Sequence, residues 1–509
     1  MKTKGIVHFV GAGPGDAQLL TLRAAELLGR ADVVMHDARV NPDVLRLVPA
    51  TSRIVALPAT DAAGGTDHTT ELARLAAEGQ CIVRLHHGDP FVFGEGAAEA
   101  ALLAAAGIGF EIVPGVLPFT GIPNYAGIPL THRAHCSSFT VADAQSRTTT
   151  PDGGIEFARL ARTPGTKVVL TDAGQVAPTV QRFLVEGLAA NTPAALMIAG
   201  TLAQQRTVTG TLSNLAARAA AAGLAGPAVL VIGSVVSLAG KLNWFETRPL
   251  FGQRVVVTRA RDQAGPLSRR LRERGADVLE VPCLRIGPPT KHEPLVEALT
   301  GLNAYDWIVF TSANGVTSFF NFFFKAFDDL RDIGGVRIAA VGPATAEKLT
   351  ELHLKVDLMP KDYVATAIAK ELAAYESIEN HRILLLRAEV ATPELPRLLD
   401  DLGAIVDDVA CYRTVPETDD ASGAGASLVA AGADWVTFTS GSTVEHFHAR
   451  FDLPELLRRF PNLKLATIGP ETSQALTALK LTPAVEAKTH TVEGLVTALE
   501  RAPARPRRA

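Results

Sequence analysis

Residues 83–100, VRLHHGDPFVFGEGAAEA, gather side chains that could take part in chemistry around two glycine turns. An apolar strand runs into a Gly-Asp-Pro turn there, and such turns bring main chain close to a small ligand. His86 and His87 could bind a metal ion or accept a proton, with Glu95 nearby. Adjacent residues of a strand point to opposite faces, however, and the sequence places no third ligand. We therefore expect no metal site and interpret both histidines as surface or cleft-lining residues.

A second glycine-rich turn, GAGPGD at residues 11–16, follows one strand and precedes a helix. This arrangement is typical of a dinucleotide fold, but Asp16 stands where the GxGxxG motif places its last glycine. Pro14 also removes a main-chain N–H that a pyrophosphate would use. Asp37, just after the next strand, could bind a ribose hydroxyl, so an NAD-dependent oxidoreductase stays a remote alternative. A third turn, VPGV at residues 113–116, favours a ligand site over an empty turn.

Two stretches of the C-terminal half recur as a pair. YDWIVFTSANGV at residues 305–316 is echoed by ADWVTFTSGSTV at 433–444, and IAAVGPATAEKL at 338–349 by LATIGPETSQAL at 465–476. Each motif begins a helix at the carboxyl end of a strand, where main-chain N–H groups point towards anions. The repeat predicts two similar α/β lobes with a site for anionic groups between them.

Short β-branched runs alternate with Ala/Leu-rich stretches along the whole chain, which predicts an α/β fold with βαβ units on mostly parallel sheets. At 509 residues the chain is too long for one hydrophobic core. We place the main boundary near Phe251, where aromatic residues, a proline and a glycine separate two strand patterns. The N-terminal half divides again near residues 129–152, where TTTPDGG looks like a linker.

The overall composition limits the expected partners. A net charge of −4 gives no general reason to expect nucleic acid or an anionic membrane surface. The four cysteines show no CxxC spacing, so we expect reduced thiols rather than zinc sites or disulfides. No apolar run is long enough to span a bilayer and the first residues enter a strand at once, which predicts a soluble cytoplasmic protein. The arginine-rich tail, residues 501–509, is interpreted as a solvated end.

Five ordered motifs between residues 5 and 240 resemble the tetrapyrrole methylases, most nearly uroporphyrinogen-III C-methyltransferase. They are VGAGPGDAQLLTLRAAELLGRADVVMHD, VRLHHGDPFVFGEG, EIVPGV, YAGIPLTHR and AGTLAQQRTVTGTL. The resemblance implies two α/β domains, about 1–130 and 131–245, with S-adenosylmethionine folded into the cleft between them, and a homodimer. It also implies that Asp37 is the catalytic acid and that the methyl donor is bound by Pro14, Gly88, Asp89, Val92 and Gly200.

Several positions near this cleft depart from the family pattern. Where the family has a lysine, a glycine and an arginine, this chain has His86, His87 and Glu95, and residues 55–61 lack the family's proton-donating lysine. Uroporphyrinogen carries eight carboxylates, and each charge-assisted hydrogen bond that is lost costs about 1.5 to 3 kcal/mol. We therefore expect methyl transfer to be absent or greatly weakened. Arg133 is the best remaining cation for a substrate carboxylate, with a structural salt bridge as its alternative role. Two further pairs differ from the family, namely Leu117-Pro118 for Thr-Ser or Thr-Ala and Thr171-Asp172 for Met-Gly.

Residues 252–499 resemble uroporphyrinogen-III synthase in a whole series of motifs. The series is VVVTRARDQAGPLSRRLRERGADVLEVPCLRI, FTSANGV, AAVGPATAEKL, ILLLRAE, VACYRTVP, FTSGSTV and TIGPETSQAL. The resemblance implies two lobes joined by a two-stranded ladder, one built from 252–284 and 415–500 and the other from 285–412. Such enzymes close hydroxymethylbilane into a ring while inverting its last pyrrole, without a cofactor.

Tyr412, at the crossing between the lobes, matches the position proposed in that family to assist departure of the substrate hydroxyl. On residue type alone it could equally pack in a core. Residues at helix starts would help to bind substrate carboxylates, or serve only as N-caps, and these are Ser312, Asn314, Thr345, Ser440 and Thr472. Supplementary cations, or members of surface ion pairs, are Arg259, Arg261 and Arg387.

The two resemblances together imply tetrapyrrole biosynthesis, in which the second half makes the substrate of the first on the route to precorrin-2, sirohaem and cobalamin. We expect a working synthase joined to a methylase-like half with little or no methyl transfer. A fully active bifunctional enzyme is the main alternative. A binding or scaffolding module in place of a methyltransferase is another.

Overall fold

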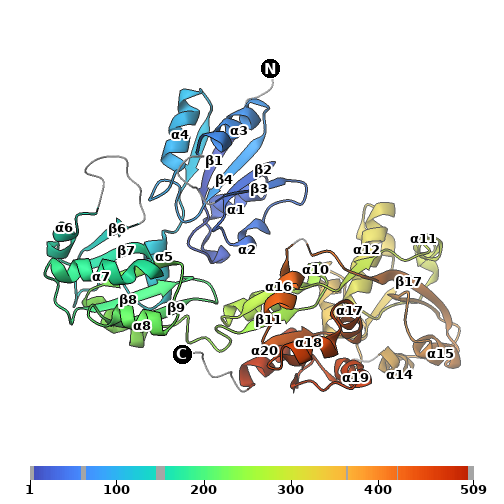
Figure 1. Cartoon of the computed structure of the whole chain (residues 1–509). Coiled ribbons are helices and arrows are strands. Elements are labelled where there is room, and N and C mark those ends of the chain that lie inside the picture. The colour runs from blue at the N-terminus through green and yellow to red at the C-terminus, as the bar shows by residue number, and fades with distance from the viewer. Residues whose placement is uncertain (1–4, 59–64, 145–154, 363–364, 421, 503–509) are drawn as a thin grey trace.

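The computed structural model describes residues 5–58, 65–144, 155–362, 365–420 and 422–502. Within them, four five-stranded sheets follow one another along the chain, and each sheet carries a hydrophobic core on both faces (Figure 1). Helices cover these faces because successive strand residues point to opposite sides and both sides of the inner strands are apolar. The α/β expectation is confirmed.

The first sheet is entirely parallel, in the order β3-β2-β4-β1-β5. Helix α1 (Leu22–Leu28) packs on one face, and α3 (Gly65–Ala77) and α4 (Gly96–Ala105) pack on the other. The carboxyl ends of β1, β4 and β5 therefore meet at one edge, where the three glycine turns lie. The strands are β1 (Ile6–Gly11), β2 (Val33–Asp37), β3 (Arg53–Leu57), β4 (Cys81–His86) and β5 (Phe110–Val113).

The second sheet, in the order β6-β7-β10-β8-β9, departs from the expected mostly parallel pattern. Only β6 and β7 run parallel, whereas the β7–β10, β10–β8 and β8–β9 pairs are antiparallel. The short connection between β8 and β9 accounts for the last pair, because it is too short for a crossover helix. The strands are β6 (Phe139–Asp143), β7 (Thr166–Asp172), β8 (Pro193–Ile198), β9 (Arg206–Thr211) and β10 (Pro227–Ile232).

The third and fourth sheets are interleaved in the sequence. The third, β12-β11-β18-β19-β20, is parallel, and the fourth, β13-β17-β16-β14-β15, has only β13 antiparallel to its neighbour. The chain leaves the third sheet through β13 and returns through β17, and these two strands pair side by side. The strands are β11 (Arg254–Val257), β12 (Asp277–Glu280), β13 (Leu284–Gly287), β14 (Trp307–Phe310), β15 (Arg337–Ala340), β16 (Arg382–Ala388), β17 (Ile405–Pro416), β18 (Trp435–Phe438), β19 (Lys464–Thr467) and β20 (Val485–Glu486).

The other α-helices mostly cover these sheets. In chain order they are α2 (Pro42–Leu45), α5 (Pro118–Tyr125), α6 (Phe157–Arg162), α7 (Val176–Val185), α8 (Leu215–Ala221), α9 (Ala239–Leu242), α10 (Arg261–Glu273), α11 (Glu293–Thr300), α12 (Ala313–Ala326), α13 (Pro343–Glu351), α14 (Ala365–Tyr375), α15 (Glu394–Asp401), α16 (Ala424–Ala431), α17 (Gly441–Phe451), α18 (Leu453–Arg459), α19 (Pro470–Ala478) and α20 (Val492–Arg501). None of the helices in the described residues is both long and apolar enough to cross a membrane.

Two residues next to the predicted boundaries belong to ordered elements of the second half. Leu250 is fully buried in the core of the third sheet with Val255 and Leu267, so this core begins before the expected start at residue 252. Its N–H also donates to the Arg274 carbonyl, at 2.9 Å. At the other end, Arg501 still belongs to α20 rather than to the expected tail, whose residues 503–509 lie outside the described part of the chain.

The two halves also touch away from the linker. Arg46, just after α2, forms an ion pair with Glu280 at the end of β12, with 2.6 Å between Nη1 and Oε2. Arg272 of α10 reaches both Asp43 of α2, at 3.2 Å, and Glu280, at 3.3 Å. Ion pairs therefore connect the region of α2, beside the first sheet, with α10 and β12 of the third-sheet domain.

Candidate functional site

The three glycine turns of the first sheet meet through main chain alone. Gly13 and Gly88 exchange two hydrogen bonds, of 3.1 and 2.9 Å, and both have a positive φ that favours glycine. A Cβ placed on Gly115 would lie 2.1 Å from the Gly88 carbonyl oxygen, and one on Gly11 would lie 2.5 Å from the Gly115 Cα. No side chain fits between these turns, so the position of each loop is determined by the other two.

A cleft of about 510 Å³ opens between these turns and the second sheet, and we call it the N-terminal cleft. Of the residues expected at the methyl donor, Pro14, Val92 and Gly200 line it. Gly88 and Asp89 do not line the cleft but contact residues next to it. A Cβ on Gly88 would lie 2.8 Å from Cδ of Pro118, which lines the cleft, and Asp89 Oδ2 accepts from the Gly115 N–H at 3.0 Å. The structure therefore groups all five residues around one cleft.

Several of the departures from the family pattern lie in this lining. Leu117, Pro118 and Thr171 all border the cleft, and so does the side chain of His87. Glu95 instead lies exposed before α4, whose first turn it leaves without a side-chain cap. His87, Leu117, Pro118 and Thr171 therefore alter the cleft wall directly, whereas Glu95, the replacement that reverses a charge, is not part of the lining.

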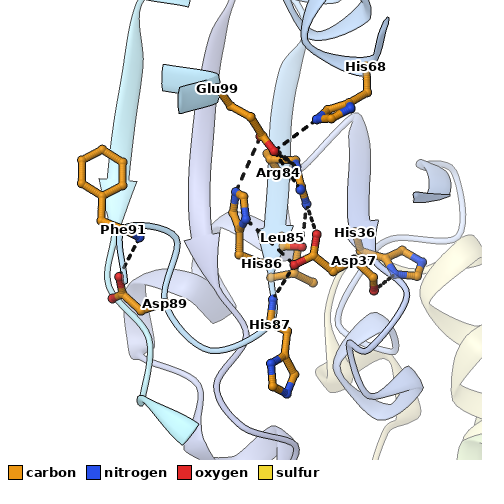
Figure 2. Close-up of polar contacts among 10 residues, drawn as sticks. All are labelled: His36, Asp37, His68, Arg84, Leu85, His86, His87, Asp89, Phe91 and Glu99. Carbon is orange, nitrogen blue, oxygen red and sulfur yellow. Dashed lines mark hydrogen bonds and ion pairs between the residues drawn. The ribbon is translucent and has the colours of Figure 1, made fainter. Parts of the chain in front are cut away.

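Asp37 is held in a buried charged network rather than in the cleft lining (Figure 2). Arg84 Nη1 donates to Asp37 Oδ1 at 2.7 Å, and the His87 main-chain N–H donates to Asp37 Oδ2 at 2.9 Å. Arg84 also binds Glu99 with two nitrogens, Nε at 3.0 Å and Nη2 at 2.9 Å. Burial raises the pKa of Asp37, but the charge of Arg84 and the hydrogen bonds from Arg84 and the His87 N–H outweigh it and leave the pKa below its usual value. An ionised Asp37 can accept a proton but has none to donate.

His86 and His87 point to opposite sides, as expected for neighbours on a strand (Figure 2). His86 is 3% exposed, and its ring lies between two carboxylates, with Nδ1 3.9 Å from Asp37 and Nε2 3.7 Å from Glu99. Its Nε2 has no hydrogen-bond partner among the described residues. Burial lowers the pKa of each histidine to about 4, and the nearby guanidinium groups of Arg84 and Arg39 respectively add to that shift. Both rings are therefore neutral near pH 7.

The sequence interpretation missed the centre of this network. Arg84 and Glu99 were visible only as the arginine of a strand motif and a helical glutamate fifteen positions later. A buried arginine requires acidic partners, which is a signal that could have linked these residues to Asp37. His68, which lies 3.1 Å from Glu99 Oε1, gave no signal at all.

A second polar constellation lies where β17 crosses between the third and fourth sheets. The Tyr412 and Ser312 hydroxyls are 3.0 Å apart, and Ser312 Oγ also accepts from the Gly315 N–H as the N-cap of α12. Tyr412 is 8% exposed, and burial raises the pKa of its phenol. Across the crossing, Gln263 of α10 donates a hydrogen bond to Asn314 Oδ1. This bond joins a helix of the third sheet to a helix of the fourth.

Comparisons with known proteins agree with both resemblances. The family model described as Tetrapyrrole (Corrin/Porphyrin) Methylases matches residues 6–216, and the one described as Uroporphyrinogen-III synthase HemD matches residues 265–497. A protein of Ruminiclostridium josui described as porphyrin biosynthesis protein HemD is 33% identical over 97% of this chain and 97% of its own length. The chain belongs to this family of fused tetrapyrrole methylases and uroporphyrinogen-III synthases.

A further relative and a solved structure each match a smaller share of the chain. Uroporphyrinogen-III C-methyltransferase of Bacillus subtilis (strain 168) is 31% identical over 74% of this chain and 78% of its own length. Among solved structures, uroporphyrin-III-C-methyltransferase from Thermus thermophilus shares 36% identity and covers 48% of this chain and 98% of its own, with a TM-score of 0.40. The expected fusion is confirmed, and the protein is an enzyme of tetrapyrrole biosynthesis with a methylase half and a synthase half.

The helix-start residues of the synthase half differ in accessibility. Ser440 begins α17 in a capping box with Thr443, and Asn314 lies in the first turn of α12. Thr345 and Thr472 are 4% and 3% exposed, so their side chains are packed inward. At these two positions only main-chain N–H groups at the helix start remain as anion donors.

The candidate cations fall into two groups. Arg387 is paired with Asp408 and also donates to the Thr392 carbonyl, while Arg261 is paired with Asp419 at 2.8 Å. These two therefore form the ion pairs that sequence reasoning had left open. Arg259, which follows β11, has no ion-pair partner in the described part of the chain, and its burial lowers its pKa. Arg133 is exposed and likewise has no ion pair with a described residue, so the salt-bridge role expected as its alternative finds no support there.

Proposed function

We propose that the synthase half converts hydroxymethylbilane to uroporphyrinogen III, and that the methylase half binds S-adenosylmethionine without efficient methyl transfer. The observation that carries the first part is the Tyr412–Ser312 hydroxyl pair at the crossing strand. A buried phenol beside a hydroxyl, next to two helix starts, joins a proton donor to sites for carboxylates.

In this proposal Tyr412 protonates the departing hydroxyl of the substrate. Its raised pKa keeps the phenol protonated near pH 7, and a proton from Ser312 can satisfy the phenol oxygen, leaving the Tyr412 proton free for the substrate. The carbon–oxygen bond breaks and the hydroxyl leaves as water, which leaves an N-protonated azafulvene cation and the phenolate of Tyr412. As the last pyrrole closes the ring, its α-carbon loses one proton, which returns to the phenolate. Arg259 and the starts of α12 and α17 bind substrate carboxylates. These contacts fix the conformation of the linear substrate, which is the protein's main contribution because the azafulvene is itself reactive.

The N-terminal cleft of the methylase half is large enough for S-adenosylmethionine. A cleft of about 510 Å³ with main chain brought close by glycines lies within the range of small-molecule sites. S-adenosylmethionine, when bound, supplies an electrophilic methyl group. Pro14, Val92 and Gly200 would hold it, while His87, Leu117 and Pro118 bring an imidazole and apolar groups to the wall where the family has small residues. Elsewhere in this half, the family's lysine and arginine are replaced by His86 and Glu95, and residues 55–61 lack its lysine, which supports weak methyl transfer.

Two assays test the two parts separately. Purified protein is given hydroxymethylbilane without added metal or cofactor, and the uroporphyrinogen isomers are separated after oxidation. Type III product well above the no-enzyme control is expected, and type I alone would overturn the synthase assignment. Incubation with uroporphyrinogen III and methyl-labelled S-adenosylmethionine is expected to leave precorrin-2 nearly unlabelled, whereas label at ordinary enzymatic turnover would establish the fully bifunctional alternative.

The remaining alternatives are less well supported. For an NAD-dependent oxidoreductase, Asp37 would have to bind a ribose, but both of its carboxylate oxygens are taken by Arg84 and the His87 N–H. A scaffolding role of the methylase half is tested by calorimetric titration with S-adenosylhomocysteine, since a scaffold has no reason to bind it. The homodimer, the cytoplasmic location and the division near residues 130, 252, 285 and 412 stay predictions.

A further inference from the structure

A second and larger cleft, of about 980 Å³, lies between the two halves. On one side it is bounded by the start of β9 and the linker before β11. On the other side it is bounded by residues at the amino ends of β11, β12, β18 and β19. We call it the inter-half cleft.

Three arginines of its wall have no carboxylate partner among the described residues. Arg206 donates only to the Ala222 carbonyl, at 2.6 Å. Arg248 donates through Nη1 to the Arg272 carbonyl, at 3.5 Å, and its guanidinium lies 4.7 Å from the ring centre of Trp244 and 5.0 Å from that of Phe245. The Arg459 guanidinium lies 5.4 Å from the ring centre of Phe460. Stacked guanidinium groups keep their edge N–H donors available for a carboxylate.

The acidic residues of the same wall are already satisfied by the protein. Glu246 Oε1 accepts from Gln205 Nε2 at 2.9 Å and from Thr207 Oγ1 at 2.6 Å. Asp277 is paired with Arg254 at 2.7 Å, and Asp434 accepts from the Arg254 N–H at 2.8 Å. None of these contacts uses Arg206, Arg248 or Arg459, whose guanidinium groups are therefore the wall's donors for an entering carboxylate.

The inter-half cleft is separate from both reaction sites. It lies at the amino ends of the third-sheet strands, whereas Ser440 and Arg259 lie at their carboxyl ends. One turn separates it from the N-terminal cleft, because Leu202 lines that cleft and Ala203 lines this one. Buried Gln205 joins the two walls, accepting from the Thr201 N–H at 2.8 Å and donating to Glu246.

We propose that the inter-half cleft binds a tetrapyrrole polycarboxylate outside both reaction sites. The choice of ligand class rests on the proposed function, which gives the enzyme substrates and products with many carboxylates. The volume is at the upper end of small-molecule sites, as a macrocycle requires. Phe251 and Phe460 in the lining offer apolar surface for pyrrole rings, and the three arginines of the same lining offer donors for carboxylates.

The test uses uroporphyrin I, an oxidised octacarboxylate on which neither proposed reaction can act. Its binding to the full chain is followed by quenching of tryptophan emission, to which Trp244 contributes from a 45% exposed position beside Arg248, and the stoichiometry is obtained by calorimetry. The triple variant Arg206→Gln, Arg248→Gln, Arg459→Gln is expected to lose one binding site or to weaken it about a thousandfold, since each of the three charge-assisted contacts contributes roughly tenfold. Synthase turnover and thermal midpoint should stay unchanged.

A matched triple variant, Arg159→Gln, Arg331→Gln, Arg458→Gln, removes three exposed arginines outside the cleft and should bind like the unmodified chain. Mesoporphyrin, with two carboxylates, should bind much more weakly than uroporphyrin I. Equal binding of uroporphyrin I by both triple variants would overturn the proposal even when the synthase assay succeeds. Equal affinity for the two porphyrins would overturn its ionic basis.

Discussion

The hydroxyl of Tyr412 lies 3.0 Å from that of Ser312, which joins the strand that crosses between two sheets to the first residue before a helix. Any movement of β17 relative to α12 changes this distance. The proposed proton donor is therefore placed by the arrangement of the two lobes rather than by one loop.

Replacing Tyr412 by phenylalanine should lower kcat of the synthase by about a hundredfold, the lower range for loss of a general acid. The ring still packs, so the thermal midpoint should move little. Tyr375→Phe, at a 56% exposed tyrosine, is the matched control. Steady-state rates of type III formation provide the measurement, and a Tyr412→Phe rate within twofold of the unmodified rate contradicts the assignment.

Replacing His87 by glycine, the residue that the family carries there, should raise the affinity for S-adenosylhomocysteine about tenfold. The imidazole occupies part of the cleft wall and is neutral, so its removal makes room without removing a charge. Calorimetric titration measures the change. His490→Gly, at an exposed histidine outside the cleft, should leave the affinity as it was, and an unchanged affinity in His87→Gly would show that the imidazole does not obstruct the ligand.

Acidification should destabilise the methylase half through His86. Its folded pKa of about 4 lies below the unfolded value of 6.5, so the unfolded chain binds the extra proton first. The stability is complete above pH 6.5 and is lost as the pH falls towards 4. Between pH 7 and pH 5 this one histidine removes about 2 kcal/mol from the free energy of unfolding.

His86→Gln should remove that contribution, since the ring nitrogen Nε2 makes no hydrogen bond with a described residue that glutamine would have to replace. Urea unfolding at pH 7 and pH 5 gives the comparison. His87 contributes with the same sign, so about half of the pH effect should remain in the single variant. A single variant as acid-sensitive as the unmodified chain argues against the low pKa of His86.

Truncated chains should separate the two halves only when cut early enough. A fragment that starts at residue 243 keeps Leu250 in the core of the third sheet and should retain synthase activity. A fragment that starts at residue 252 loses this fully buried leucine, at a cost of about 2 to 5 kcal/mol, and should melt at a lower temperature. Both fragments lose the Arg46–Glu280 ion pair, so that contact cancels in the comparison of their melting curves. Equal melting temperatures would mean that Leu250 contributes little.

The sequence was most informative where the main chain decides the structure. The glycines at 11, 88 and 115 predicted a ligand turn, and their close approach is what the structure contains. It was least informative about side chains that meet over long separations. Arg84 and Glu99 come together with Asp37 only through sheet order, and Gln263 reaches Asn314 only because two lobes face each other. The antiparallel pairs of the second sheet also depend on strand order, which hydrophobic pattern alone does not specify.

Because of the main-chain contact among Gly11, Gly88 and Gly115, the shape of the N-terminal cleft and its side-chain chemistry depend on different residues. The approach of the three turns depends on residues that have no side chain, whereas the chemical groups in the cleft come from the side chains of other residues. Substitutions at His86, His87 and Glu95 can therefore change the side chains in and near the cleft without altering the main-chain contact that shapes it. Gly115→Ala would have the opposite effect. Its Cβ would lie 2.1 Å from the Gly88 carbonyl oxygen, so the turns would have to move apart while the other side chains stayed unchanged.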